Sequence, residues 1–337
     1  MTEIPDLEWD AFVDAHPDAT FFHRAAWRRV APGVFGHRAH FLNARRADGA
    51  IGAVLPLVEI RSRLFGHALI SNAFCVGGGP LAADDVSLSA VINEAEALGR
   101  RLGVDYVELR DTPRAGPGWE ARCDLYSGFE GPIAAAEEEN LLQIPRKQRA
   151  VIRKALAVES TTSIDRTAEH FYPLYADTMR KHGTPALPRR YFETLLSVFG
   201  DSCEILTIHH GGQATSSVLS FYFRDRVMPY YTGSRSEARQ RGSNDLMYWA
   251  VMRRAAELGY SVFDFGRSKI GTGPHSFKRN WGFEPRPISH QYLLVKGSAL
   301  PNVNPTNPHY ALLIKAWQRL PTPIATAISP MLSRSLA

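Results

Sequence analysis

The chain has 337 residues, which at roughly 150 residues per domain predicts two globular domains and excludes a single small module. Hydrophobic residues make up 45% and charged residues 22%, a balance that excludes a wholly disordered chain and a fibrous repeat. The net charge of +5 suits anionic partners without identifying one.

Targeting and redox signals are weak. The first residues are acidic where a signal peptide is basic, and no apolar run approaches the ~20 residues of a membrane span. The cysteines Cys75, Cys123 and Cys203 lie far apart without a CxxC pair, so neither a disulfide framework nor a zinc site is indicated. We expect a cytoplasmic protein without a membrane-spanning segment.

The first half of the chain predicts a strand hairpin, a helix and a buried strand. Residues 41–45 and 49–60 form the hairpin around a Gly-containing turn. A helix capped by Asp84 or Asp85 ends at Gly103 and leads into a strand at 104–110.

The second half repeats this order. A hairpin is expected from 204–208 and 212–223, and a helix capped by Ser243 or Asn244 ends at Gly259 before a strand at 260–266. The repeat predicts two α/β domains, each with a mixed sheet and a crossover helix, and chance similarity of common elements is the alternative. The expected layout is an N-terminal domain at 1–135, a basic helical connector at 136–165, a C-terminal domain carrying the site at 166–299, and a Pro-rich amphipathic tail at 300–337.

The connector changes the sign of charge abruptly after Pro145. A short amphipathic helix is expected there, with four apolar side chains inward: Val151, Ile152, Ala155 and Leu156. Its cations are Arg146, Lys147, Arg149, Arg153 and Lys154. They form either a solvated helix face or a rim that binds the phosphates of an RNA or nucleotide donor.

The tail contains no acidic residue from 300 onward. It predicts a helix with an apolar stripe made of Tyr310, Leu313, Ile314, Trp317 and Leu320. Docking of this stripe on the body is favoured over contact with a membrane surface or a partner.

Residues 263–285 are the strongest candidate for a site. The expected strand ends at Phe265 and opens into a loop that combines glycines and cations: Gly266, Arg267, Lys269, Gly271, Gly273, His275 and Lys278. Because ligands of α/β sheets bind at the carboxyl ends of strands, such a loop can surround an oxyanion or a phosphate. For the glycines and His275 a purely structural role is the alternative.

Two side chains of this segment are candidates for chemistry. Lys278 lies between Phe277 and Trp281, so aromatic neighbours can hold its stem while its ammonium reaches a cleft. Asp264 points away from its two Phe neighbours if the strand alternates, and it can orient an amine, act as a base, or pair with Arg267.

A second anion site is suggested before the second helix. Arg239, Arg241 and Gly242 can hold a diphosphate at the helix N-terminus. A coenzyme A cradle would have a small residue where this chain has Asn244. No HExxH, Walker A or GxSxG motif occurs, so no metal site is expected and metal, ATP and serine-nucleophile chemistry are unsupported.

Several long motifs resemble the FemAB family of tandem GNAT-like acyltransferases. They are IPRKQRAVIRKA at 144–155, DFGRSKIGTG at 264–273, FKRNWGFEP at 277–285, and the tail pattern around Asn304, Tyr310, Trp317 and Leu320. These motifs look most like FemAB-related proteins found with exosortase/PEP-CTERM systems and exopolysaccharide loci. The resemblance implies two tandem GNAT-like domains over most of residues 38–295.

The resemblance also implies a reaction. It is transfer of an aminoacyl group from aminoacyl-tRNA to an amine on a cell-envelope precursor, with Phe277 and Lys278 near the reacting ester and no tightly bound cofactor. We expect Lys278 to stabilise the oxyanion, Asp264 and His275 to assist proton transfer, and three cations to hold anionic groups: Arg146, Lys147 and Arg153. The alternatives are a GNAT-type enzyme that uses acetyl- or acyl-coenzyme A, and a non-catalytic RNA- or polysaccharide-binding protein.

Overall fold

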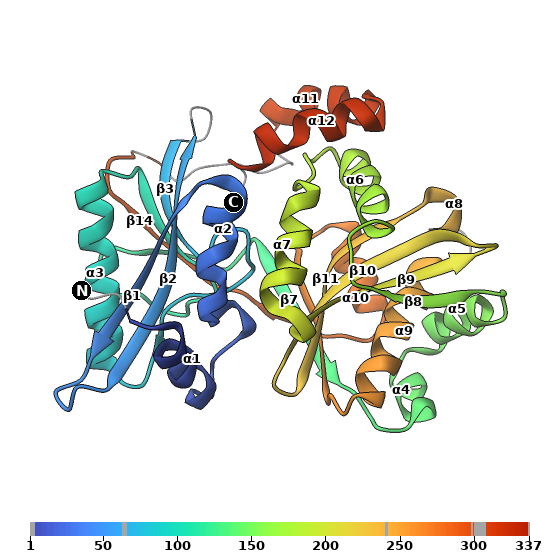
Figure 1. Ribbon diagram of the computed structural model, residues 1–337, viewed down its shortest axis with the longest axis horizontal. Coiled ribbons are helices and arrows are strands. Elements are labelled where there is room, and N and C mark those ends of the chain that lie inside the picture. The colour runs from blue at the N-terminus through green and yellow to red at the C-terminus, as the bar shows by residue number, and fades with distance from the viewer. Residues whose placement is uncertain (1–3, 63–65, 240–241, 298, 300–307, 336–337) are drawn as a thin grey trace. The chain divides into compact units, whose positions relative to one another are not determined.

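The computed structural model describes residues 4–62, 66–239, 242–297, 299 and 308–335, without the side chains of 238–239 and 308–311 (Figure 1). The chain divides into two compact units. Unit 1 comprises Met1–Leu125, Pro287–Asn304 and Met331–Ala337, and unit 2 comprises Tyr126–Arg286 and Pro305–Pro330.

Unit 1 is a mixed sheet with helices on it. Its helices are α1 (Asp6–Ala15), α2 (Val30–Phe35) and α3 (Asp85–Leu102), with 3₁₀ turns at Phe21–His23 and Ala25–Arg29. Its strands are β1 (Arg38–Arg45), β2 (Ile51–Ser62), β3 (Gly66–Ser71), β4 (Leu81–Ala82), β5 (Tyr106–Leu109), β6 (Glu120–Arg122) and β14 (His290–Leu294). The described strands run in the order β1-β2-β3-β5-β14-β6, with β4 beside β2, and only β3 and β5 are parallel neighbours.

Unit 2 repeats this design with more helices. Its helices are α4 (Glu137–Gln143), α5 (Arg146–Leu156), α6 (Phe171–His182), α7 (Arg189–Phe199), α8 (Ser236–Arg239), α9 (Ser243–Glu257), α10 (Gly273–Asn280), α11 (Pro308–Arg319) and most of α12 (Thr322–Ser333), with a 3₁₀ turn at Gly200–Ser202. The last residues of α12, from 331 onward, belong to unit 1. Its strands are β7 (Tyr126–Pro132), β8 (Thr161–Asp165), β9 (Cys203–His210), β10 (Gln213–Phe223), β11 (Arg226–Ser234), β12 (Val262–Lys269) and β13 (Pro285–Pro287). The described order is β13-β7-β12-β11-β10-β9-β8, and β11 and β12 are parallel.

Each sheet contains one strand from the other half of the sequence. β14 follows the whole of unit 2 in the chain, yet it lies between β5 and β6 and pairs with both. β7 precedes unit 2's helices and pairs along the full length of β12. Both sheets are therefore mixed and completed by a strand distant in sequence, and the expected mixed α/β class is confirmed.

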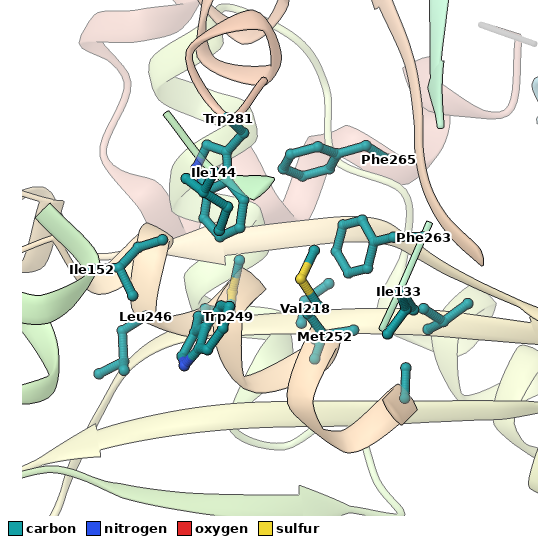
Figure 2. Packing of buried hydrophobic residues seen from close by; sticks show 14 of the residues in the cluster. Ile133, Ile144, Ile152, Val218, Leu246, Trp249, Met252, Phe263, Phe265 and Trp281 are labelled. Atoms are coloured by element: carbon teal, nitrogen blue, oxygen red, sulfur yellow. The ribbon is translucent and has the colours of Figure 1, made fainter. Parts of the chain in front are cut away.

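The core of unit 2 lies between its sheet and α9. Trp249 and Met252 of α9 pack against Val218 of β10, and Phe263 and Phe265 of β12 join the same cluster (Figure 2). Each of these side chains is almost completely buried, and burial of such side chains supplies most of the free energy that holds a helix on a sheet. This packing fixes β12, the strand from which the candidate site begins.

The structure confirms most of the expected local elements. Both hairpins form, and in the second one Gly211 and Gly212 adopt φ of 55° and 75°, the positive values that a tight two-residue turn needs. Asp84 caps α3 by accepting a hydrogen bond from the Ser87 N–H at 2.7 Å, and α3 ends at Gly103 in the left-handed conformation.

The expected cap of α9 is wrong. Gly242 takes the N-cap position without a side-chain cap, because the hydroxyl of Ser243 is held by Ser216 at 2.7 Å. The inward face of α5 is also narrower than expected: Ile152 and Ala155 are buried, whereas Val151 and Leu156 are 36% and 39% exposed.

The tail forms two helices, α11 and α12, beside α6 (Figure 1). Ile314 packs against Gly183 at the end of α6, which confirms docking of the tail on the body. Leu313, expected on the docked stripe, is 67% exposed, and Asn304 and the side chain of Tyr310 lie outside the described residues. Among the described helices, none is both long and apolar enough to cross a membrane.

Candidate active site

The candidate site begins where two parallel strands of unit 2 separate. β11 and β12 pair only at their first residues, Arg226 with Val262 and Val227 with Phe263. Beyond Phe263, β12 continues to pair with β7 on its other side as far as Lys269. One edge of β12 therefore leaves its neighbour at Asp264, at the carboxyl end of the parallel pair, where ligands of α/β sheets bind.

Lys278 is the most unusual charged group near this point. It lies on α10, is 8% exposed, and donates a hydrogen bond to the Arg267 carbonyl at 3.0 Å. Its Nζ lies 5.6 Å from the centroid of the Phe129 ring and 5.4 Å from that of Phe265. Burial lowers the pKa of Lys278 to about 7, and the charge of Asp264 opposes this shift. The described residues use one of its three possible N–H donors, so the others can serve a substrate.

Asp264 is half-buried between the buried Phe263 and Phe265 of β12, as the alternation predicted, and its charge acts on Lys278. Its Oδ1 accepts a hydrogen bond from the Gly266 N–H at 2.9 Å, and its Oδ2 lies 3.8 Å from an Arg226 nitrogen. Burial raises the pKa of Asp264, while the Gly266 N–H and Arg226 oppose the increase. A carboxyl group in this setting can hold or release a proton closer to neutral pH than usual.

The predicted loop after Phe265 is largely regular structure. Gly266, Arg267 and Lys269 lie on β12, because β7 supplies hydrogen-bond partners that the sequence could not reveal. Gly266 has φ of 69° beside a register shift, and a Cβ there would lie 3.9 Å from the Lys278 Nζ. Burial lowers the pKa of Lys269.

The turn ends in a helix. Gly271 has φ of 78°, and α10 begins at Gly273. His275, Phe277 and Lys278 are therefore on a helix rather than in a loop. The His275 ring lies 5.2 Å from that of Phe129, edge to face, so it is near Lys278's aromatic neighbour. The guanidinium of Arg267 lies 4.4 Å from the Tyr126 ring centroid.

Phe277 belongs to an aromatic group that anchors α10. Its ring lies 5.6 Å from Tyr248 and 6.2 Å from Trp281. The Trp281 indole N–H donates to Asp245 Oδ1 at 3.0 Å, and the same oxygen accepts a short hydrogen bond from the Gln148 side-chain amide. Burial raises the pKa of Asp245. This carboxyl group thus ties together α5, α9 and the end of α10.

The basic helix α5 lies against the beginning of α9. A Cβ added to Gly242 would lie 3.2 Å from the Ala155 Cβ and 3.4 Å from a Val151 methyl group. Arg146 and Lys147 are exposed, and neither forms an ion pair with a described residue. Arg153 is also exposed and lies 3.5 Å from Glu138. The helix α5 therefore packs along the first turn of α9, a 15-residue helix whose N-terminus favours negative charge.

Two predicted residues cannot be placed. Arg241 and the side chain of Arg239 lie outside the described part of the chain, so the proposed diphosphate cradle is represented there by Gly242 alone.

In unit 1, the position equivalent to the separation of β11 and β12 is occupied by the protein's own side chains. β5 pairs in parallel with β3 through Glu108, the counterpart of Asp264 in the repeat, and the Arg110 N–H then donates to the Ser71 hydroxyl at 2.8 Å. The Arg110 side chain is buried, with Nε donating to Glu108 at 2.8 Å and Nη1 to the Cys75 carbonyl at 2.6 Å. The candidate site therefore belongs to unit 2.

Sequence reasoning missed the residues that support the site. Arg226, Gln148, Tyr248 and Asp245 come from four positions far from the 263–285 segment, and each reads locally as an ordinary surface or helix residue. Asp245 leaves no signal in the sequence, because an acidic residue in the first turn of a helix is ordinary and its burial is evident only in the fold. Among the described residues, no group of three or more His, Cys, Asp or Glu side chains could hold a metal ion.

Residues 143–279 match a family model described as an acetyltransferase (GNAT) domain. This match contains α5, α9 and the site up to Lys278. Among curated protein sequences, none matches the chain.

Three solved structures resemble this chain in fold over most of its length. The crystal structure of FemX has a TM-score of 0.69 at 17% identity, with 93% of this chain and 99% of that chain covered. The structure of L-PGS from Bacillus licheniformis has a TM-score of 0.55 at 14% identity, with 98% and 99% covered. A tandem GNAT protein from the clavulanic acid biosynthesis pathway has a TM-score of 0.57 at 12% identity, with 87% and 95% covered. The chain therefore has a tandem GNAT-like acyltransferase fold, and its second unit carries the acetyltransferase (GNAT) domain match.

Proposed function

We propose that this chain transfers an aminoacyl group from aminoacyl-tRNA to a primary amine. The observation that carries the proposal is Lys278, a buried amine with unused N–H donors where β11 and β12 separate. Enzymes that act on esters need a donor aimed at the oxygen on which negative charge develops, in a place sheltered from water.

The reaction follows from these groups. The acceptor amine attacks the ester carbonyl, forming a C–N bond and a tetrahedral intermediate whose oxyanion accepts a hydrogen bond from the Lys278 ammonium. The ester C–O bond then breaks, the ribose hydroxyl of the tRNA leaves with a proton, and the new amide remains on the acceptor. We assign Asp264 to take the proton that the amine loses and to give a proton to the leaving ribose oxygen, a role that its raised pKa supports.

The donor is supported by the surface beside the site. Arg146 and Lys147 are exposed in the first turn of α5, a helix that packs along the start of α9. A tRNA acceptor end offers several phosphates to such a surface. The motifs shared with the FemAB family favour the same donor. For the acceptor we propose an amine on a cell-envelope or exopolysaccharide precursor, because the connector and tail motifs resemble FemAB-related proteins of exosortase systems.

A second candidate is transfer from acetyl- or acyl-coenzyme A. It is favoured by the GNAT domain match and by Gly242, which begins α9 without a side-chain cap and so suits a diphosphate at the helix N-terminus. The two donors differ in one testable respect, since only binding of the tRNA requires a long row of cations on the protein surface.

Binding of charged tRNA, deacylated tRNA and acetyl-coenzyme A, measured in parallel at several salt concentrations, distinguishes the donors. We expect preference for charged tRNA, with the Arg146→Ala/Lys147→Ala variant lowering the slope of log K against log salt by roughly 0.7–0.9 for each phosphate that the variant no longer neutralises. Arg100→Ala/Arg101→Ala, on α3 of unit 1, is the matched control and should leave the slope unchanged. Binding of coenzyme A with indifference to tRNA supports the second candidate, and salt-sensitive tRNA binding without any transfer indicates a binding protein.

Chemistry is tested separately from binding. Lys278→Ala is expected to lower the single-turnover rate of amide formation by about 10²–10³, the usual effect of removing one oxyanion donor. An unchanged rate in this variant excludes the role assigned to Lys278.

A further inference from the structure

The tail helices use only one side to dock on unit 2. Ile314 and Gln318 of α11 contact the end of α6, where the Gln318 side chain donates to the Lys181 carbonyl at 2.9 Å. In α12, Ala325 and Ser329 are buried, and the Ser329 hydroxyl accepts a hydrogen bond from the Ala186 N–H at 3.1 Å. These contacts fix the orientation of both helices about their own axes.

Each helix also has exposed apolar residues away from its docked side. Ile324 and Ile328, one turn apart on α12, are 51% and 38% exposed. On α11, Leu312 and Leu313 are 79% and 67% exposed. A helix that packs on a protein through one face normally presents polar residues on the other, so this apolar outer face is unusual.

The charged residues of the tail itself have one sign. From residue 300 to the end the sequence contains no Asp or Glu, and α11 carries Lys315 and Arg319 without an ion-pair partner among the described residues. Arg319 lies seven residues after Leu312 and hence on the same side of the helix. α12 has no charged residue along its length.

We propose that the outer face of α11 and α12 binds the surface of an anionic lipid bilayer. Apolar side chains beside cations, on short helices held parallel to a protein surface, are the pattern of helices that enter the headgroup region without crossing the membrane. The lipid acyl boundary covers Leu312, Leu313, Ile324 and Ile328, while Lys315 and Arg319 meet lipid phosphates. This inference is independent of the donor and of the role of Lys278.

Co-sedimentation of the full chain with vesicles tests the proposal. We expect binding to phosphatidylcholine vesicles that contain phosphatidylglycerol, and little binding to vesicles of phosphatidylcholine alone. The triple variant Leu312→Ser/Ile324→Ser/Ile328→Ser should lower the partition coefficient at least tenfold, and Lys315→Glu/Arg319→Glu about tenfold at low salt.

The control replaces equally exposed apolar residues elsewhere, Leu7→Ser/Val86→Ser/Leu258→Ser, and should bind like the unmodified chain. Thermal melts confirm that each variant folds; if the triple variant does not, the charge-reversal variant still decides the result. Equal binding to both vesicle types, or undiminished binding by the variants, overturns the proposal. A dimer in sedimentation velocity that the triple variant abolishes also overturns it, because the face would then be covered by a second copy.

Discussion

Lys278 combines two properties that normally exclude each other, a long cationic side chain and almost complete burial. The Arg267 carbonyl and two aromatic rings replace only part of the water that the ammonium loses. The charged and neutral forms are therefore nearly balanced near neutral pH. An anionic intermediate would shift this balance toward the charged form, which is the form that the proposed mechanism uses.

The pH dependence of transfer follows from this balance. If the ammonium of Lys278 is the active form, kcat/KM falls as pH rises through about 7, because this parameter reports the free enzyme. In Lys278→Arg the guanidinium stays charged, so whatever activity remains should show no decline near 7. A profile that instead rises through pH 7 and loses that rise in Lys278→Arg contradicts the oxyanion role and indicates that the neutral amine acts as a base.

Asp245 supports the site by accepting two hydrogen bonds in a buried place. Asp245→Ala leaves the Trp281 N–H without its acceptor, and we expect a loss of about 1–3 kcal/mol in the free energy of unfolding. Asp245→Asn keeps an acceptor oxygen and removes a buried charge, so it should unfold at the same or a higher urea concentration at pH 7. Equal losses in the two variants would show that the charge, rather than the hydrogen bonds, matters.

Single residues differed in how well the sequence predicted them. Lys278 was recognisable because it lies between Phe277 and Trp281, and the alternation of β12 predicted that Asp264 points away from its buried Phe neighbours. Gln148 and Asp245 were not recognisable in the sequence. The two residues are almost a hundred positions apart, so their buried hydrogen bond leaves no local pattern.

At the scale of elements, Gly233 determines how closely α6 approaches β11. A Cβ at this position would overlap the backbone of Leu174 and Tyr175, with the Tyr175 Cα only 2.6 Å away. Gly233→Ala should therefore lower the free energy of unfolding by about 1–3 kcal/mol or more, since backbone cannot move aside as a side chain can. Gly33→Ala, where nothing lies within 4 Å, is the control and should be neutral or slightly stabilising in urea unfolding. A neutral Gly233→Ala would mean that α6 can shift without cost.

Elements were predictable where a local pattern defines them. The helices after Asp84 and Pro145 follow from caps and periodicity, and the two hairpins follow from Gly-containing turns. The length of β12 was underestimated, because Gly266 looks like the end of a strand unless β7 is known to pair with residues beyond it. Likewise, the exposed side of α11 could not be distinguished from its docked side without α6.

At the scale of the whole molecule, β7 and β14 link the two halves of the sequence, because each completes a sheet whose other strands are distant in the chain. Leu293→Pro, in the middle of β14, removes a ladder hydrogen bond and a buried leucine, and should cost unit 1 about 3 kcal/mol or more. Hydrogen exchange should then show weaker protection of β5 and β6 amides, with β9 and β10 amides in unit 2 still protected. Leu293→Val is the conservative control, and retained protection of β5 and β6 in the proline variant would contradict a central role for β14.

The repeat was visible in the sequence, but the pairing of β7 and β14 with strands distant in the chain was not. Each half shows its own hairpin, helix and strand, so the sequence predicted two domains in succession. Pairing of β7 with β12, and of β14 with β5, joins segments separated by more than a hundred residues. Such partners are chosen by packing on the pleated surface rather than by local propensity, which explains why this level of organisation emerges only in three dimensions.

The position of β14 also sets the order in which the chain can become complete during synthesis. Leu109 ends β5 about 180 residues before Leu294 ends β14. At a synthesis rate of 5–20 residues per second, β14 is therefore made roughly 10–40 s after β5. During that interval the hydrogen-bonding edges of β5 and β6 are open. The sheet of unit 2 has all of its strands once Pro287 has been added, seven residues before Leu294. The unit that begins the chain is therefore the last to close its sheet.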